Sequence, residues 1–278
     1  MKIDAHQHFW ALARGDYGWL TPELPPLYRD FLPADLAPVL RVNGVEGTVL
    51  VQAAPTIAET EFMLGLADDN PFILGVVGWV DFEAPDAIGQ ITRLATHPKF
   101  VGLRPMIQDI SDVDWMLSKT HTPIFRAMAT SELAFDALVL PKHLPNLQEL
   151  VRDHPDLSIV IDHAAKPEIA AGQFNEWAAN MVSLAQNTSV AVKLSGLVTE
   201  AAKDWTVSQL RPYVEHLLDH FGPTRMIWGS DWPVCTLACA YDDWCAATDQ
   251  ILKDLNETDR DAILGGNAAR IYRIKGAA

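Results

Sequence analysis

The sequence lacks a disulfide framework, a long apolar run and an excess of positive charge. Its three cysteines are an odd number confined to residues 235–245, so structural disulfides are not indicated and a reducing compartment is expected. The apolar stretches fall short of the roughly 20 residues that a membrane-spanning helix needs. The N-terminal segment reaches His6 before an apolar signal sequence can form. We therefore expect a cytoplasmic protein.

The net charge and the composition limit the classes of partner that the protein can bind. The chain carries 21 basic and 36 acidic residues, a formal net charge of −15, which is repelled by phosphate backbones and anionic lipid. We therefore expect neither nucleic acid nor a membrane as a partner; the oligomeric state stays open. With 49% hydrophobic and 21% charged residues, the chain can build a large core, which excludes disordered, collagen-like and coiled-coil proteins.

Short apolar runs alternate with longer amphipathic runs along the chain. Several short runs, such as Thr48–Val51, are almost wholly apolar, as in parallel strands that helices cover on both faces. The predicted strands are residues 2–6, 47–52, 73–80, 100–104, 134–139, 158–162, 190–194 and 226–229. The predicted helices are residues 36–43, 59–70, 85–97, 122–131, 144–154, 173–186, 208–221 and 241–252.

Repeated strand–helix alternations, spaced by roughly 25–45 residues, predict the α/β class and a (β/α)8 TIM barrel. A doubly wound open sheet is the alternative, but no glycine-rich fingerprint follows the first strand. No linker or low-complexity tract divides the chain, so we expect a single domain over residues 1–278. A capping box at Thr258–Asp261 and a second helix start at Asn267 predict an extra C-terminal helix packed across the barrel.

One predicted connection is unusually long. Residues 9–33 carry Pro22, Pro25, Pro26 and Pro33 without a helical period. A loop of this length after the first strand is long enough to need a function, and a lid over the mouth of the barrel is the obvious one. The alternative is a surface loop with no role in the site.

Histidines follow the first and sixth predicted strands. His6 and His8 are two residues apart, so in a strand both side chains point to the same face, here the barrel interior. Two imidazoles aimed together can bind one divalent cation or donate two hydrogen bonds to one oxygen. His163 follows the sixth strand, and the C-terminal ends of barrel strands converge on one pocket. The alternative is that these are structural histidines.

A carboxylate follows the last predicted strand. Asp231 lies between Trp228 and Trp232, behind Gly229, which is expected to let the backbone turn tightly. Burial among aromatic rings is expected to shift the pKa of this carboxyl group, which suits a general base. The alternative is a helix N-cap before Pro233.

Five segments in order from residue 3 to residue 272 carry a family likeness: His6–Trp10, Asp162–Pro167, Lys193–Gly196, Trp228–Pro233 and Gly266–Arg270. Together they resemble the amidohydrolase superfamily, amidohydrolase-2 type, and most of all its sugar-lactonase branch, the L-fuconolactonase and L-rhamnonolactonase type. The resemblance covers nearly the whole chain, and it implies a (β/α)8 barrel that hydrolyses a carbonyl compound with water.

The resemblance also implies a substrate and a set of roles. The partner would be a small-molecule sugar lactone, an aldonolactone such as L-fucono- or L-rhamnono-lactone, in carbohydrate catabolism. Asp231 would be the catalytic carboxylate that activates water. His6, His8 and His163 would polarise the carbonyl, directly or through a metal ion.

The chain departs from the binuclear members of this superfamily. The fourth strand ends in Gly102–Pro105, without the lysine or glutamate that bridges two metals, and the fifth strand ends without a histidine. The sequence therefore supports at most one divalent metal ion. Zinc is the first candidate, and the metal need not be essential for activity. Its ligands would come from His6, His8, His163 and Asp231; the alternative is three neutral histidines acting without metal.

Polar and aromatic residues near other strand ends are candidates for binding the substrate. Cations there suit hydroxyl, ring-oxygen or carboxylate groups, and indole rings offer flat apolar faces to sugar C–H groups. For the cations the alternative is a structural salt bridge, and for the tryptophans it is core packing. The candidates are Arg104, Lys193, Trp10, Gln52, Glu59, Trp79 and Trp232.

Three functions remain open from the sequence. The first is a lactonase acting on a neutral sugar lactone. The second is a metal-dependent decarboxylase or hydratase of the same superfamily, or a lactonase for a carboxylated pyrone lactone, for which several pocket arginines are expected and only Arg104 is well placed. The third is a barrel used only for binding or scaffolding.

Overall fold

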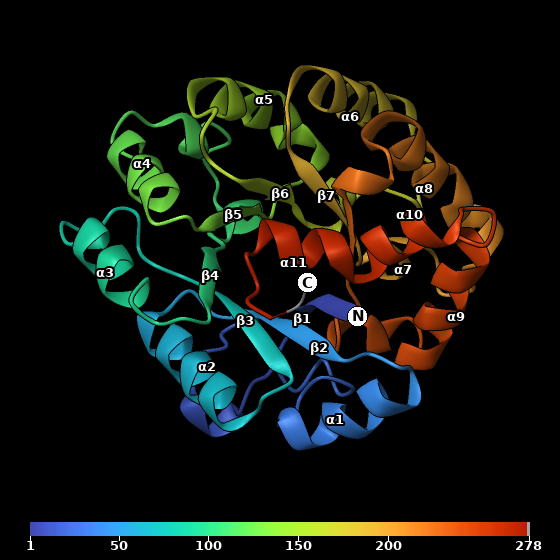
Figure 1. Ribbon diagram of the computed structural model, residues 1–278, viewed down its shortest axis with the longest axis horizontal. Helices are drawn as coiled ribbons and strands as arrows, with labels where there is room; N and C mark the ends of the chain where they lie inside the picture. Colours follow the sequence, from blue (N-terminus) through green and yellow to red (C-terminus); the bar gives the residue numbers. More distant parts are fainter. Residues whose placement is uncertain (277–278) are drawn as a thin grey trace.

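In the computed structural model, which describes residues 1–276, the strands form one barrel. Across these residues an eight-stranded parallel sheet runs in sequence order from β1 to β8, which confirms the predicted (β/α)8 fold (Figure 1). The strands are β1 Ile3–Gln7, β2 Gly47–Val51, β3 Ile73–Gly78, β4 Phe100–Leu103, β5 Ala134–Ala137, β6 Ile159–Ile161, β7 Ala191–Leu194 and β8 Met226–Trp228.

Helices surround the barrel as an outer ring (Figure 1). None of the helices within residues 1–276 is long and apolar enough to span a membrane. The ring is made of α1 Pro33–Val42, α2 Ile57–Asp69, α3 Ala87–Leu94, α4 Thr122–Thr130, α5 Leu144–Asp153, α6 Asn175–Asn187, α8 Val207–Phe221 and α9 Tyr241–Ile251, with the short α7 Leu197–Glu200 after β7.

The strands are buried on both faces because their side chains alternate between two cores. Val49 and Val51 of β2 join the cluster that fills the barrel interior, whereas Leu50 between them joins the cluster shared with the helices. A period of two is what an extended strand produces. Both faces of β2 are therefore apolar, as a parallel strand under helices requires.

The interior cluster is closed at one end by the C-terminal tail. Ala268, Tyr272 and Ile274 belong to the same buried cluster as the barrel interior, and α11 Asn267–Ile271 crosses this end of the barrel (Figure 1). The Asn267 amide donates to the Pro223 and Met226 carbonyls at 2.7 and 2.8 Å, beside the start of β8. The site must therefore lie at the opposite, C-terminal end of the strands.

Several predicted helix starts differ from the observed starts by two or three residues, and two of them show why. The tail helix α10 Glu257–Asp261 is capped by Asn256, whose side chain accepts from the Asp259 N–H at 2.9 Å, rather than by Thr258. Similarly, α1 begins at Pro33 because proline suits the first helical position. Asp35 then lies in the first turn, where its carboxylate accepts from the Leu32 N–H at 2.8 Å.

Candidate active site

The barrel closes where the segment after β8 lies against the end of β1. The Asp231 N–H donates to the His6 carbonyl at 2.7 Å, and the His8 N–H donates to the Trp232 carbonyl at 2.7 Å. The Asp4 carboxylate strengthens this seam, because it accepts from the Ser230 N–H at 2.8 Å and from the Ser230 hydroxyl at 2.5 Å. The seam places the first-strand histidines beside Asp231.

Gly229 serves the seam by allowing a close approach, not by making the expected tight turn. A Cβ atom at this position would lie 2.7 Å from the His6 Cβ and 3.0 Å from the His6 backbone nitrogen. The positive φ falls instead on Asp231, at 59°. Left-handed backbone is uncommon for a residue other than glycine, so the fold fixes the direction of this carboxylate.

Three imidazoles surround the Asp231 carboxylate. Its Oδ1 atom lies 3.3 Å from His8 Nε2, 3.8 Å from His6 Nε2 and 3.9 Å from His163 Nε2. The His6 ring centroid lies 4.9 Å from that of His8 and 4.3 Å from that of His163. All four side chains are buried. The structure thus brings together the four residues predicted to act together.

Two of the imidazoles are oriented by groups behind them. His8 Nδ1 donates to the Val51 carbonyl at 2.8 Å, and His163 Nδ1 lies 2.9 Å from the Ser195 hydroxyl. His163 itself has a φ of 50°. A side chain at Gly196 would collide with His163, because a Cβ there would lie 2.6 Å from its Nδ1. Both rings therefore present Nε2 to Asp231.

The cluster combines an ionised carboxylate with two imidazoles, His6 and His163, whose pKa values burial lowers. Burial lowers the pKa of His163 to about 4. Burial acts to raise the pKa of Asp231, but His163, the hydrogen-bonded His8 and His6 hold that pKa below its usual value. The expected pKa shift of Asp231 is therefore downward, opposite to the effect of burial alone. A carboxylate that is already ionised can accept a proton from water.

A buried charge network lies next to His6. The Lys193 ammonium lies 2.5 Å from Asp136 Oδ2, 2.8 Å from Asp162 Oδ1 and 3.1 Å from His6 Nδ1. The Tyr272 hydroxyl donates to the Asp136 carboxylate at 2.9 Å. Despite burial, the Lys193 ammonium and His6 hold the pKa of Asp162 well below its usual value. This network connects the tail of the chain to the site.

The sequence prediction missed these acids and the tyrosine. Asp162 lies inside a recognised motif, and Asp136 is a charge inside an otherwise apolar predicted strand, which is a signal for a buried ion pair. Tyr272 gives no such signal, because its contact with Asp136 depends on how the tail folds under the barrel.

A cavity of about 300 Å³ opens beside the four-residue cluster. The sequence prediction missed several of its walls, among them Trp19 from the long loop, whose Nε1–H donates to the Ala53 carbonyl at 2.8 Å. The loop after β1 therefore contributes a wall of the cavity, and its role as a lid stays a prediction. The lining residues are His8, Trp19, Ala53, Arg104, Met106, Gln108, Asp109, Leu138, His163, Lys166, Asp231 and Val234.

Arg104 reaches this cavity from the end of β4 but is also held by the protein. Its guanidinium donates to the Gln52 carbonyl and lies 3.6 Å from Asp162 Oδ2. The Arg104 side chain is 5% exposed. Asp162 therefore largely balances the positive charge of Arg104, and one edge of the guanidinium remains at the cavity.

The other proposed substrate-binding residues do not line the cavity. Trp10 and Trp232 pack edge-on against Phe31, with ring centroids 5.3 and 5.2 Å from that of Phe31, in the core to which the long loop contributes. Gln52, Glu59, Lys193 and Trp79 are also absent from the described lining.

Three of these four have partners inside the protein. The Gln52 amide donates to the Arg104 carbonyl at 2.7 Å. The Glu59 carboxylate accepts from the Ala53 and Ala54 N–H groups at 2.9 and 2.8 Å. Lys193 is fully buried in its network of acids. Their polar groups thus serve the fold or the residues around the site.

The four clustered side chains carry the kinds of ligand atom that bind a single divalent metal ion. Ligand atoms of His6, His163 and Asp231 all lie within 4.8 Å of one another. His8 adds a nitrogen whose ring is oriented by a backbone carbonyl, as is typical of zinc-binding histidines. Imidazole nitrogens and one carboxylate are zinc ligands. The Lys193 ammonium near His6 is the group that opposes a cation there.

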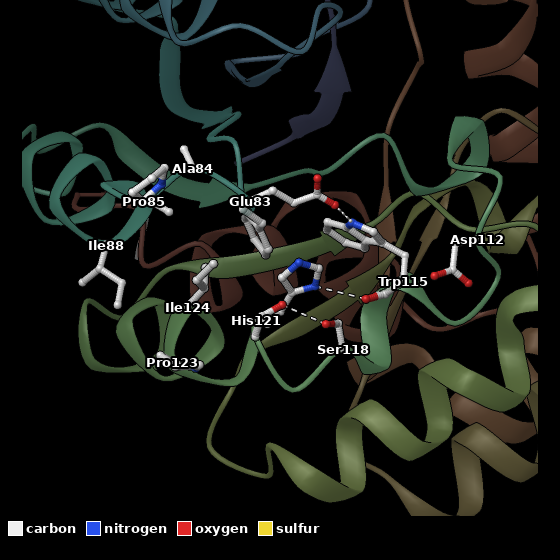
Figure 2. Close-up of a pocket in the computed structure, with 13 residues that line it drawn as sticks. Glu83, Ala84, Pro85, Ile88, Asp112, Trp115, Ser118, His121, Pro123 and Ile124 are labelled. Atoms are coloured by element: carbon white, nitrogen blue, oxygen red, sulfur yellow. Dashed lines mark hydrogen bonds between the residues drawn. The ribbon is translucent and has the colours of Figure 1, made fainter.

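A larger cavity, of about 520 Å³, lies on the outside of the barrel between α3 and α4 (Figure 2). Its main polar groups are paired with one another. The Trp115 Nε1–H donates to Glu83 at 3.2 Å, and His121 Nδ1 donates to the Trp115 carbonyl at 3.0 Å. None of the four clustered residues lines it. Size alone therefore does not locate the active site.

Comparisons with known proteins return full-length similarities. The family described as Amidohydrolase matches residues 3–274. An L-fucono-1,5-lactonase of Burkholderia ambifaria is 47% identical, over 98% of this chain and 96% of the relative. An L-fucono-1,5-lactonase of Burkholderia multivorans is 36% identical, over 99% and 96%. A zinc-bound crystal structure of an amidohydrolase from Burkholderia multivorans is 35% identical, covers 99% of both chains and superposes with a TM-score of 0.92.

Proposed function

We propose, from the premise that this chain belongs to the amidohydrolase family, that it is an enzyme that hydrolyses a sugar lactone, with L-fucono-1,5-lactone as the first candidate. The match over residues 3–274 confirms the family expected from the sequence motifs. The two relatives named L-fucono-1,5-lactonase support this activity and this lactone. L-Rhamnono-lactone remains a prediction.

The observation that carries the proposal is one carboxylate within 3.9 Å of three imidazole nitrogens, beside a cavity of about 300 Å³. A lactone is an internal ester, so its hydrolysis needs an activated water and donors for the oxyanion of the tetrahedral intermediate. The cluster offers both at the C-terminal end of the barrel, where the active sites of this fold lie.

In the first step, the Asp231 carboxylate takes a proton from water as the water oxygen bonds to the lactone carbonyl carbon. The carbonyl π electrons move onto oxygen, and the Nε2–H groups of His6 and His163 stabilise the resulting oxyanion. A donor aimed at such an oxyanion contributes about 3–4 kcal/mol to lowering the barrier. Burial keeps His163 neutral at neutral pH, so it does not neutralise Asp231 beforehand.

In the second step, the tetrahedral intermediate collapses and the bond from the carbonyl carbon to the ring oxygen breaks. Asp231 returns its proton to the departing ring oxygen, which becomes a hydroxyl group. The product is the open-chain sugar acid. The same carboxylate thus acts as general base toward the attacking water and then as general acid toward the departing ring oxygen.

The walls of the cavity favour a neutral polyhydroxylated substrate. Its two cations already have acidic partners: Arg104 lies 3.6 Å from Asp162, and Lys166 lies 3.9 Å from Glu200. A dicarboxylate would need further unpaired cations. Trp19 supplies a flat apolar wall and Gln108 a polar one, which suits the C–H and O–H groups of a sugar ring.

Zinc is proposed as a ligand of this site that turnover does not require. His6, His163 and Asp231, with His8 as a further nitrogen, are the residues that would hold it, and His6 would give up its Nε2 proton to do so. A bound zinc would supply Lewis-acid polarisation of the carbonyl oxygen. The zinc-bound relative supports the occupancy of such a site by a metal, and the N–H groups of His6 and His163 supply the alternative donors.

A pH-indicator assay over a panel of aldonolactones, with and without exhaustive chelation, tests the proposal. We expect rapid hydrolysis of L-fucono-1,5-lactone that survives chelation. A preference for a pyrone dicarboxylate would contradict the neutral substrate. Activity on no lactone, together with metal-dependent loss of CO₂ from an aromatic acid, would replace the lactonase by a decarboxylase.

A further inference from the structure

We propose that Lys193 is a positioning residue that holds His6 in the tautomer with its proton on Nε2, so that His6 can donate to the substrate oxygen. The tautomer follows from the geometry of the buried network; its catalytic consequence rests on the function proposed above. Lys193 was expected from the sequence to bind substrate, but it is fully buried and does not line the cavity.

The Lys193 ammonium is surrounded by hydrogen-bond acceptors. A lysine ammonium has three N–H donors and no acceptor. Three acceptors lie within reach of Lys193 Nζ: Asp136 Oδ2 at 2.5 Å, Asp162 Oδ1 at 2.8 Å and His6 Nδ1 at 3.1 Å. Two of these contacts are hydrogen bonds, to Asp136 Oδ2 and to the lone pair of His6 Nδ1, whereas the contact with Asp162 Oδ1 is an ion pair. A neutral imidazole has one N–H, so the His6 proton is on Nε2.

Two other contacts of His6 compete with this assignment and are longer. Asp162 Oδ1 lies 3.5 Å from His6 Nδ1, beyond ordinary hydrogen-bond length. The Arg104 Nη1 atom lies 3.4 Å from His6 Nε2. Arg104 and Lys193 cannot both donate to one neutral ring. The Lys193 contact is the shorter of the two, at 3.1 Å against 3.4 Å, so we assign the lone pair of His6 to Nδ1.

The assigned tautomer leaves an N–H directed at the reaction site. His6 Nε2 lies 3.8 Å from Asp231 Oδ1, too far for a hydrogen bond. The N–H is therefore free to meet the carbonyl oxygen of a substrate that Asp231 attacks with water. The opposite tautomer would present a lone pair to the oxyanion and repel it.

The tail of the chain supports Lys193 from below. The Tyr272 hydroxyl donates to the Asp136 carboxylate at 2.9 Å, and Asp136 is the nearest acceptor of Lys193. Tyr272 lies just beyond α11, within the cluster that closes the end of the barrel opposite the cavity. A line of contacts thus runs through the barrel from Tyr272 through Asp136 and Lys193 to His6.

The tautomer can be read directly by long-range ¹H–¹⁵N correlation spectra of the full-length protein labelled with ¹⁵N-histidine. Chelation precedes the measurement, because zinc on His6 would replace the Nε2 proton. The His6 signals are identified by their loss in His6→Gln. We expect the Nε2–H pattern in the wild type and its loss or mixing in Lys193→Met. An Nδ1–H pattern in the wild type, or an unchanged pattern in Lys193→Met, overturns the proposal.

Kinetics on the same variants separate positioning from binding. Lys193→Met should lower kcat by about 10–100-fold, the range for partners that orient a site residue, with KM nearly unchanged because Lys193 does not reach the cavity. A change confined to KM contradicts the positioning role. The spectra need no substrate, so inactivity on every lactone would defeat the proposed function while leaving the tautomer assignment decided separately.

Lys193→Met removes the cation that lies between Asp136 and Asp162 and can fail to fold, so Tyr272→Phe provides a second test. It removes one hydroxyl and keeps the ring. We expect a partial shift of the His6 signals and a lower kcat at constant KM. The matched control is Tyr213→Phe, a buried tyrosine packed against Phe174 and Trp177, which should change neither. Equal spectra and kcat in Tyr272→Phe and Tyr213→Phe contradict the proposal.

Discussion

At the scale of single residues, the site depends on how neighbours set protonation. Asp231 is buried, yet the imidazoles around it hold its pKa below the usual value. Burial lowers the pKa of His163 to about 4. Both pKa values are lowered. At neutral pH the Asp231 carboxylate therefore stays negative, and the His163 imidazole stays neutral. This combination gives a proton acceptor next to hydrogen-bond donors.

The pH dependence of the chelated enzyme follows from these shifts. Asp231 is ionised and His163 neutral above about pH 5, so kcat/KM should be flat from about pH 5 to 8. Below about pH 4, His163 takes up a proton and pairs with Asp231, and kcat/KM should fall. Initial rates followed by NMR, corrected for spontaneous hydrolysis, measure this profile. A rise through an ionisation near neutrality would contradict the assignment of Asp231 as an already ionised base.

His163→Ala removes one of the oxyanion donors. We expect kcat to fall by about 10²–10³-fold, the range for loss of one such donor, while KM changes little. The matched variant Ser195→Ala keeps the ring but removes the hydroxyl at 2.9 Å from its Nδ1, and should give a smaller loss in kcat. If Ser195→Ala were as damaging as His163→Ala, the effect would be one of folding, which circular dichroism would reveal.

The central residues were predictable because each follows a predicted strand, and the barrel topology makes strand ends neighbours. His6, His8, His163 and Asp231 were all found in this way. Trp19 was not, because it comes from an irregular loop whose path no periodicity describes. Lys193 was identified as a residue of the site but given the wrong location, since its position in β7 does not tell how deep in the barrel its ammonium lies.

At the scale of elements, hydrogen bonds connect the start of α2 to the loop that follows β2. Glu59 lies in its first turn, and the carboxylate accepts the N–H groups of Ala53 and Ala54 in the loop after β2. Burial raises the pKa of Glu59 to about 7. The sequence suggested that Glu59 binds substrate, and it could not show that both carboxylate oxygens serve the loop.

This raised pKa makes stability depend on pH. Between pH 4.5, the ordinary pKa of a glutamate side chain, and about pH 7, Glu59 binds its proton more tightly in the folded than in the unfolded protein. The free energy of unfolding from this group therefore falls as pH rises through that range, by at most about 3 kcal/mol. Glu59→Gln cannot titrate, so this contribution should vanish.

Urea unfolding of wild type and Glu59→Gln at several pH values measures the difference. The wild type should lose stability relative to the variant as pH rises from 4.5 to 7. Glu46→Gln, at an exposed carboxylate, is the control and should follow the wild type. Parallel pH curves for wild type and Glu59→Gln would show that the Glu59 carboxyl is not protonated in the folded state.

Element centres were predicted better than element ends. The apolar runs of the strands fixed where each one lies, because burial on both faces leaves a continuous signal. The helix starts at Pro33 and Glu257 depend on capping contacts of Asp35 and Asn256. Several residues near each start can cap equally well by type, so the sequence does not single out one.

At the scale of the whole molecule, barrel closure creates the site. β1 and β8 are separated by more than 200 residues in the chain, and the hydrogen bonds from Asp231 to His6 and from His8 to Trp232 join their ends. The strand order was predictable from the strand–helix alternation. The closing role of the tail was expected, but its hydrogen bond through Tyr272 into the buried network was not.

The rate of L-fucono-1,5-lactone hydrolysis by wild type and Asp231→Asn, followed by NMR at neutral pH, tests the central claim most directly. Asparagine keeps the shape but cannot accept a proton from water. We predict that kcat falls by about 10²–10⁴-fold with an unchanged thermal unfolding transition. A folded Asp231→Asn protein that hydrolyses the lactone at close to the wild-type rate would contradict the account.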